Sequence, residues 1–227
     1  DLLRSLSMKF QMQLDHGMLT SSANKWFSLR FKETDLNSID EAKEWLEDAT
    51  SRMYDAIAKS NFQQEIFEAY HDLIAFGTSC LMIEEDQDDI LLFSARHIKE
   101  IYIQENKKGF VDTIYRRFKM PSQAAADKFG LENVSRDLVN KARKNPFDDV
   151  QLVHVVRPRL DFDPGKQDKK NMPFQSIYME YESGHIISIG GFKESPYVIP
   201  RYLKASTEQY GRSPGMNALP DVKVLNK

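Results

Sequence analysis

The sequence predicts an α+β fold, with N-terminal helices followed by a mainly antiparallel sheet that carries a short helical insert. Three observations favour this class. Apolar residues recur at helical spacing as far as Phe76, the pattern changes to short alternating runs after Gly77, and two helical stretches interrupt those runs. We therefore expect a helical part over residues 1–77 and a β-rich part over residues 78–210, with the insert at 121–144.

Three helices are expected in the first third of the chain. Residues 1–19 place apolar side chains at three- and four-residue spacing. A second helix covers residues 39–60, where Ser38 and Glu41 match a capping box. A third covers residues 62–76, before a glycine. The apolar side chains of the second helix are expected in the core: Ile39, Ala42, Trp45, Leu46, Ala49, Met53 and Ile57.

Short runs of β-like composition follow, and the two insert helices lie among them. The first two runs are joined by an acidic hairpin loop, Glu84–Asp89, and the clearest hairpin turn is Glu182–Gly184. Pro200 lies inside the last run, and because proline cannot donate a backbone hydrogen bond, it predicts an edge strand or a bulge there. The expected strands are Ser79–Glu84, Ile90–Ala95, Ile98–Ile103, Val111–Lys119, Val150–Arg159, Phe174–Tyr181, His185–Ile189 and Tyr197–Leu203. The expected insert helices are Pro121–Phe129 and residues 133–144.

The C-terminal segment combines rigid and permissive backbone positions. Gly211, Pro214, Gly215 and Pro220 lie a few residues apart, which describes a specified loop rather than a flexible tail. The sequence ends within an apolar run and begins without methionine. We expect that the natural protein continues on both sides.

Composition disfavours several classes of protein. The formal charge is −3, whereas a free-standing nucleic-acid binder is usually basic, so any contact with DNA is expected to be local. Cys80 is the only cysteine, which leaves no intrachain disulfide and no cysteine-rich metal site. No run approaches the ~20 apolar residues of a membrane span, and no signal peptide is visible. No membrane partner is therefore expected.

The sequence offers no group of residues with catalytic or metal-ligand spacing. It lacks a phosphate-binding glycine loop and a nucleophile elbow. The acidic run Glu84–Asp89 lacks the glycine and the closing glutamate of a calcium loop. The histidines are spread along the chain: His16, His71, His97, His154 and His185. We therefore expect no catalytic residue, no cofactor-binding residue and no metal ligand.

Three basic stretches contain interleaved apolar residues: Arg116–Lys119, Arg136–Lys144 and Arg157–Arg159. That pattern is typical of a charged outer face, with phosphate contact as the less favoured alternative. A role in interaction or assembly is therefore favoured over enzyme activity. Two alternatives stay open: a DNA-processing enzyme such as a metal-dependent nuclease, and a generic protein-binding α+β module.

Several segments in a fixed order form a recognisable set. The most specific is Tyr210–Gly215 (YGRSPG), with Leu219 and Asn226 behind it. The other segments are Leu14, Gly17–Ala23, Trp26–Leu29, Asn61-Phe62, Tyr70–Leu73, Phe76–Thr78, Glu84-Glu85, Val153-His154, Arg157–Arg159, Glu194–Pro196 and Pro200–Tyr202. This set resembles the head-to-tail connector (portal) proteins of short-tailed bacteriophages. Two departures are the missing proline after Ser22 and Tyr202 where tryptophan is common.

The resemblance implies a wing-like subunit of a homo-oligomeric ring, typically a dodecamer, at one vertex of a phage capsid. Such a ring contacts the major capsid protein, a terminase motor and tail or adaptor proteins. Double-stranded DNA passes through its channel during genome packaging and ejection. The resemblance further implies a structural virion protein, assembled in the host cytoplasm and without catalytic residues. Residues 211–227 would form a loop that leads toward a stem helix outside this sequence.

Overall fold

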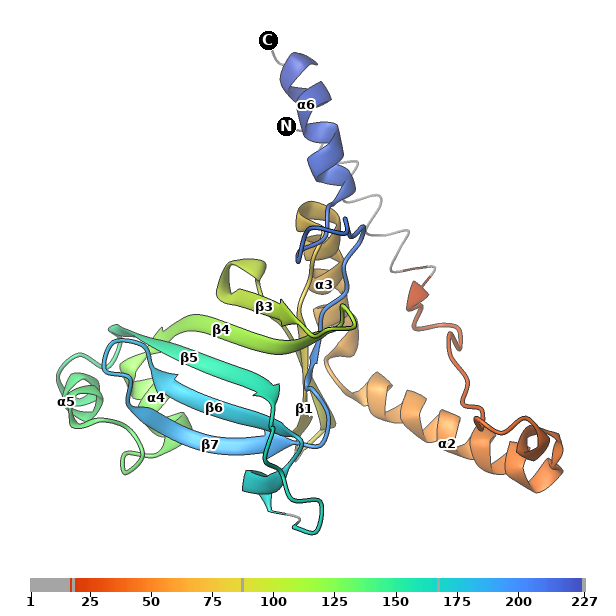
Figure 1. Cartoon of the computed structure of the whole chain (residues 1–227), viewed down its shortest axis with the longest axis horizontal. Coiled ribbons are helices and arrows are strands. Elements are labelled where there is room, and N and C mark those ends of the chain that lie inside the picture. Colours follow the sequence, from red (N-terminus) through yellow and green to blue (C-terminus); the bar gives the residue numbers. More distant parts are fainter. Residues whose placement is uncertain (1–16, 18, 87, 167, 226–227) are drawn as a thin grey trace. The chain divides into compact units, whose positions relative to one another are not determined.

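Figure 1 shows a computed structural model of the chain, which describes residues 17, 19–86, 88–166 and 168–225. The expected α+β class is confirmed by helices combined with antiparallel sheet. The described chain forms two compact units: unit 1 holds the residues up to Arg96 and from Val198 onward, and unit 2 is His97–Tyr197. The division expected at residues 77 and 210 stays a prediction. The helix expected over residues 1–19 lies almost wholly outside the described residues.

Unit 1 combines a small sheet with two long helices and a short terminal helix that contacts the second long helix. Phe62 at the start of the second long helix packs against Leu81 and Phe93 of the sheet, and these three side chains form its buried apolar cluster. The hairpin expected around the acidic loop is confirmed by the antiparallel pairing of its two strands. The sheet order is β2-β1-β8. The elements are η1 (Asp35–Ser38), α2 (Asp40–Lys59), α3 (Phe62–Phe76), β1 (Leu81–Asp86), β2 (Ile90–Ala95), β8 (Tyr197–Val198) and α6 (Pro214–Leu225).

The helix ends of unit 1 use different contacts from those expected. Ser38 does not cap α2, because it belongs to the 3-10 turn η1 and its hydroxyl donates to the carbonyl of Asp35 at 2.6 Å. The predicted capping box with Glu41 is therefore wrong. Asn61 precedes α3, and its side chain exchanges two hydrogen bonds with the backbone of Phe93, at 2.8 and 2.9 Å. This amide thus joins the start of α3 to strand β2.

Helix α2 leaves part of its expected core side exposed. Leu46 is buried as predicted, but Ile39, Trp45 and Met53 remain 46%, 60% and 44% exposed. Their predicted burial is wrong for this chain. The reason is that α2 packs through the side that carries Leu46 and Thr50, whereas Trp45 lies on another side and stacks on Phe31, with ring centres 5.9 Å apart.

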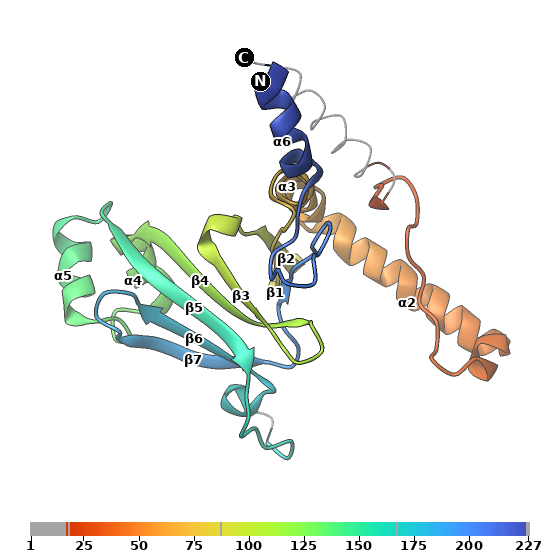
Figure 2. The same ribbon diagram turned by 45° about the horizontal axis from the view of Figure 1, so that its top comes forward.

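Unit 2 is a five-stranded antiparallel sheet in the order β3-β4-β5-β6-β7, visible in Figure 2. Helices α4 and α5 connect β4 to β5, so the predicted helical insert is confirmed. The hairpin predicted around Glu182–Gly184 is confirmed by the antiparallel pairing of β6 and β7. The elements are η2 (Ile98–Glu100), β3 (Ile101–Glu105), β4 (Val111–Pro121), α4 (Ser122–Phe129), α5 (Arg136–Lys144), β5 (Asp149–Pro158), η3 (Lys169–Asn171), β6 (Phe174–Glu180) and β7 (Ile186–Phe192).

One face of this sheet carries the core of unit 2. Phe118 and Leu152 lie opposite each other on β4 and β5, and both point to the side that α4 and α5 cover (Figure 1). The small buried side chains Ala125, Ala126 and Ala142 let the two helices approach the sheet closely. Residues of the opposite parity on the same strands must therefore lie on the other face.

The last expected strand is shorter than the sequence predicts. Of Tyr197–Leu203, only Tyr197–Val198 forms a strand, and Arg201 and Leu203 make single bridges to Thr78 and Arg212. Pro200 lacks a backbone N–H and interrupts the ladder between them. A second difference lies in the segment expected as a loop over residues 211–227, because helix α6 occupies most of it.

Candidate functional site

The block YGRSPG, which is the most specific sequence feature, lies against the end of α3. Gly77 ends that helix in the left-handed conformation, with φ 77°. Thr78, which is fully buried, accepts a hydrogen bond at its Oγ1 from the backbone N–H of Gly211 at 2.7 Å. A Cβ atom on either Gly77 or Gly211 would lie well under 3.0 Å from backbone atoms of the other segment. Glycine is therefore required on both sides of this crossing.

Ser213 joins the end of α3 to the start of α6. Its hydroxyl donates to the carbonyl of Ala75 at 2.9 Å and accepts from the N–H of Met216, also at 2.9 Å. The second bond caps α6, whose first residue is Pro214, a favoured residue at that position. The side chain of Ser213 is fully buried. Ser213-Pro214 is a local sequence signal for the start of a helix. The predicted loop is therefore wrong over Pro214–Leu225.

The approach to this crossing is held by an ion pair. The guanidinium of Arg212 contacts the carboxylate of Glu208 through two nitrogens, at 2.6 and 2.9 Å. The hydrogen bond from Arg212 lowers the pKa of Glu208, its charge lowers it further, and burial opposes the change. The same bond raises the pKa of Arg212. We call the residues Gly77, Thr78, Gly211 and Ser213, together with this pair, the α6 junction.

The basic stretches are largely engaged in contacts within unit 2. Arg116 pairs with Glu100 at 2.9 Å and lies over the ring of Phe118. Arg117 lies over the ring of Tyr181, with its guanidinium carbon 3.9 Å from the ring centre. On α5, Lys141 donates to a backbone carbonyl of β5 at 2.7 Å. Arg159 donates to two backbone carbonyls as well. These contacts agree with the prediction that the basic stretches form charged outer faces, which was favoured over phosphate contact.

A buried carboxylate organises the start of α5. Glu180 on β6 accepts hydrogen bonds from the backbone N–H and the hydroxyl of Ser135, at 2.9 and 2.8 Å. It also accepts from Ser183 at 2.8 Å. Because Ser135 is the N-cap of α5, the negative charge lies where the helix dipole favours it. The sequence gives no sign of this role, since a single glutamate at a strand end carries no pattern.

The histidine in the middle of β5 is fully buried. His154 stacks on Tyr178, with ring centres 3.9 Å apart, and its two nitrogens lie 2.9 Å from the hydroxyls of Tyr197 and Ser176. Within the described residues, no group of three or more His, Cys, Asp and Glu side chains is placed to hold a metal ion. Across the same part of the chain, no helix combines the length and apolarity needed to cross a membrane.

Hydrogen bonds to an aspartate side chain shape the acidic hairpin tip. The carboxylate of Asp86 accepts hydrogen bonds from the backbone N–H groups of Asp88 and Asp89, each at 3.0 Å. This is an Asx-type turn, in which an aspartate side chain replaces part of the backbone pairing. The tip is therefore a specified turn between β1 and β2.

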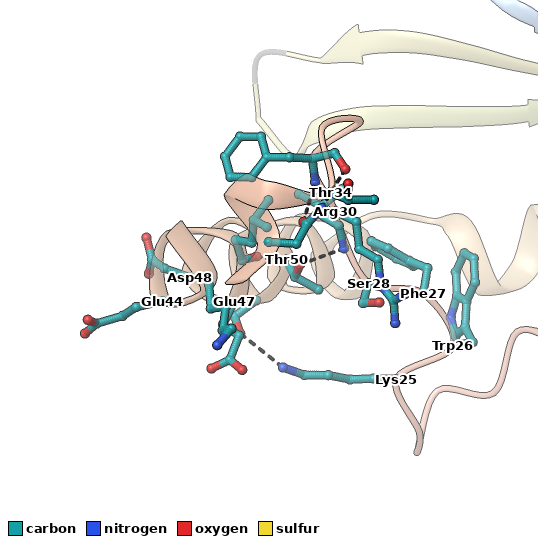
Figure 3. A pocket seen from close by; sticks show the side chains of 16 residues that line it. Lys25, Trp26, Phe27, Ser28, Arg30, Thr34, Glu44, Glu47, Asp48 and Thr50 are labelled. Atoms are coloured by element: carbon teal, nitrogen blue, oxygen red, sulfur yellow. Dashed lines mark hydrogen bonds between the residues drawn. The ribbon is translucent and has the colours of Figure 1, made fainter. Parts of the chain in front are cut away.

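A hollow lies beside α2, where an extended segment runs along the helix (Figure 3). Its volume is about 1400 Å³. The hydroxyl of Tyr54 holds the segment by accepting from the N–H groups of Trp26 and Phe27, at 2.5 and 2.6 Å. Carboxylates of Glu44, Glu47 and Asp48 line the hollow together with Lys25, Arg30 and Lys43. The mixture of both charge signs indicates no single ligand.

Comparison with known proteins matches residues 13–227 to the model of the bacteriophage head to tail connecting protein family. The chain is 33% identical over 222 residues to the portal protein of Salmonella phage epsilon15, covering 95% of this chain and 40% of that relative. It is 30% identical over 210 residues to a probable portal protein of Bordetella phage BPP-1, covering 91% of this chain and 38% of that relative. The chain thus spans about two fifths of the length of these relatives.

The matched region contains nearly the whole described chain, including the α6 junction and both compact units. This agrees with the resemblance drawn from YGRSPG and the other ordered segments. The chain belongs to the family of bacteriophage head to tail connecting proteins.

Proposed function

We propose that this chain is part of a portal subunit, which assembles as a closed ring at one vertex of a phage capsid and joins the head to the tail. The observation that carries the proposal is the family match over residues 13–227, together with two relatives that are named as portal proteins. The role is structural and needs no catalytic residue. Its partners are further copies of the chain, the major capsid protein, a terminase motor and tail or adaptor proteins.

The charge of the chain supports a channel through which DNA passes without being held. Duplex binding depends mainly on contacts between phosphates and basic side chains. The net charge here is −3, and several arginines are engaged by carboxylate, aromatic or backbone partners. We infer that a ring of such subunits lets DNA slide during packaging and ejection. Strong, salt-sensitive duplex binding by this chain in a titration would contradict that part of the proposal.

Assembly of the full-length protein tests the main proposal. Native mass spectrometry and negative-stain images of the purified full-length chain should show closed rings of one subunit number, with twelve expected. A full-length protein that stays monomeric at micromolar concentration would overturn the proposal.

Loss of the protein during infection tests the role in packaging. A nonsense variant of its gene should yield heads that lack DNA and carry no tail, and both defects should be restored by a supplied copy. DNA-filled heads in the absence of the protein would contradict the proposal.

A further inference from the structure

The sheet face of unit 2 opposite α4 and α5 is a broad apolar surface. Strand register places one row of side chains across all five strands: Tyr102, Tyr115, Val155, Ile177 and Ile189. A second row lies beside it: Arg117, Val153, Met179 and Ile186. Large members at the edges remain exposed, with Tyr102 at 54%, Ile186 at 48% and Ile189 at 42%, whereas Val155 at the centre is buried. We call these two rows the open sheet face. An apolar surface of this extent marks an interaction site.

Basic side chains gather at the end of the open sheet face where Arg117 lies. Lys119 and Arg157 have the same strand parity as Arg117, so all three lie on this face. Its carboxylates are Asp149, of the same parity on β5, and Asp112 and Asp161, which line a hollow beside Tyr115 and Arg157. The guanidinium of Arg117 is held in place by the ring of Tyr181 and by a hydrogen bond to Gln151 at 2.9 Å. A fixed guanidinium meets a partner's carboxylate with little loss of side-chain freedom.

Helix α2 of unit 1 carries an apolar stripe with the opposite charge around it. Five residues recur at three- and four-residue spacing and so share one side of the helix: Ala42, Trp45, Ala49, Met53 and Ala56. Trp45 and Met53 within this stripe are the exposed residues that the sequence pattern places in a core. The helix carries six carboxylates, from Asp40, Glu41, Glu44, Glu47, Asp48 and Asp55, against the three basic side chains of Lys43, Arg52 and Lys59, which leaves a charge of −3.

We propose that the α2 stripe of one copy seats on the open sheet face of the next copy in the ring. This inference rests on the ring proposed above and names the surfaces that join its subunits. Both surfaces carry exposed apolar side chains, and the acidic helix complements the basic end of the sheet face at Arg117 and Lys119, which favours the mixed contact. Pairing of α2 with its own copy would bring its carboxylates together. The contact is therefore head-to-tail, which closes into a ring when repeated by rotation.

The dimensions of the two surfaces match. From Trp45 to Ala56 the stripe rises roughly 16 Å, at 1.5 Å per residue. Five strands at their usual spacing of about 4.8 Å give a row roughly 19 Å wide. One α2 stripe can thus lie across all five strands and cover both rows of the open sheet face.

Cross-linking of the full-length ring tests the contact. A double variant, Trp45→Cys with Ile177→Cys, treated with a short bis-maleimide, should give a ladder of covalent multimers on a denaturing gel. Each single variant should stay at the monomer position, because the native Cys80 is buried. The matched control combines Trp45→Cys with Arg143→Cys, an exposed position on α5 at the opposite face of the sheet. That pair should give no ladder.

The outcomes separate this inference from the proposed function. Rings without a ladder from the double variant would overturn the contact while leaving the portal role intact. Dimers from Ile177→Cys alone would show that the sheet face meets its own copy, and would also overturn the contact. A monomer of altered mobility from the double variant would show that α2 reaches the face within one chain, which overturns the contact between copies as well. Absence of rings from the unmodified full-length protein would overturn both proposals.

A charge exchange gives a second readout. Arg117→Glu should weaken the rings, so that they dissociate at a protein concentration at least tenfold higher than the unmodified rings do. Asp48→Lys in the same chain should recover part of that loss. Rings unaffected by Arg117→Glu, or weakened further by the combination, would contradict the proposed pairing.

Discussion

Replacing Gly211 with alanine should loosen the α6 junction and destabilise unit 1. The added Cβ would lie well under 3.0 Å from the carbonyl oxygen of Gly77 and 3.0 Å from the Cβ of Arg201. The nearest obstacle is backbone, so no side-chain rotation relieves the clash. The two segments must move apart, and the hydrogen bond from the N–H of Gly211 to Thr78 must then lengthen or break.

The cost follows from these two contributions. Overpacking in a close-packed interior costs about 1–3 kcal/mol. Loss of a buried hydrogen bond costs about 1 kcal/mol more. We therefore expect Gly211→Ala to lower the free energy of unfolding by about 3 kcal/mol, which corresponds to a fall in Tm of roughly 6–12 °C for a chain of this size.

Tryptophan fluorescence makes this measurement specific to unit 1. The chain has two tryptophans, Trp26 and Trp45, and both belong to that unit. The matched control is Gly17→Ala, an exposed position in the same unit where a Cβ would meet nothing within 4 Å. Its free energy of unfolding should lie within about 0.5 kcal/mol of that of the unmodified chain, as is usual at open surface positions. A transition for Gly211→Ala equal to that of the control would refute the close approach of Gly77 and Gly211.

A companion variant separates the hydrogen bond from the steric contact. Thr78→Val keeps the shape of the side chain but leaves the N–H of Gly211 without its acceptor in a buried site. We expect a loss of about 1–3 kcal/mol. Thr78→Ser keeps the hydroxyl and should retain the protection of the Gly211 amide against hydrogen exchange. Equal protection in Thr78→Val would show that this bond does not hold the crossing.

Three further predictions concern other contacts. Glu180→Gln removes the charge that accepts from Ser135 and should destabilise unit 2 by about 2 kcal/mol in urea unfolding, with no loss if the carboxylate is not the organising group. Carbon NMR should show a lower pKa for Glu208 in the unmodified chain than in an Arg212→Ala variant. Because the pKa of Glu208 is lowered in the folded chain, its ion pair with Arg212 stabilises the junction fully above the ordinary glutamate pKa. This stabilisation is lost as pH falls through the lowered pKa. Pro220→Ala should stabilise α6 by up to about 3 kcal/mol, seen as slower amide exchange in that helix, whereas unchanged exchange would show that the proline does not weaken it.

The elements that the sequence predicts well are those with local signals. Helix α3 lies between Asn61 and Gly77, and the left-handed glycine ends it at the expected residue. The 182–184 turn joins two alternating runs, and Gly184 supplies the positive φ that such turns favour. In each case the residues that decide the structure are neighbours in the chain, so a pattern along the sequence contains the necessary information.

The parts that the sequence does not predict depend on residues far apart. Thr78 and Gly211 are 133 positions apart, and no local sequence pattern at either position predicts the hydrogen bond between them. The expected strand over Tyr197–Leu203 fails because backbone groups near Arg201 bond to the end of α3 instead of continuing a ladder. At the start of α6 a local signal did exist, since Ser213-Pro214 is a favoured cap, but Gly215 and Pro220 disfavour helix and outweighed it.

The exposed stripe on α2 shows a different kind of discrepancy, which bears on function. Its pattern is that of a helix with a buried side, and yet Trp45 is 60% exposed in the isolated chain. A tryptophan side chain buries roughly 150–250 Å², so covering the exposed part would remove roughly 120 Å² from water and contribute about 3 kcal/mol. A pattern of burial that the chain alone does not satisfy is what a subunit needs when a neighbour completes its core. The prediction of a buried Trp45 is therefore wrong for the single chain. We expect it to hold in the proposed ring, which the cross-linking experiment tests.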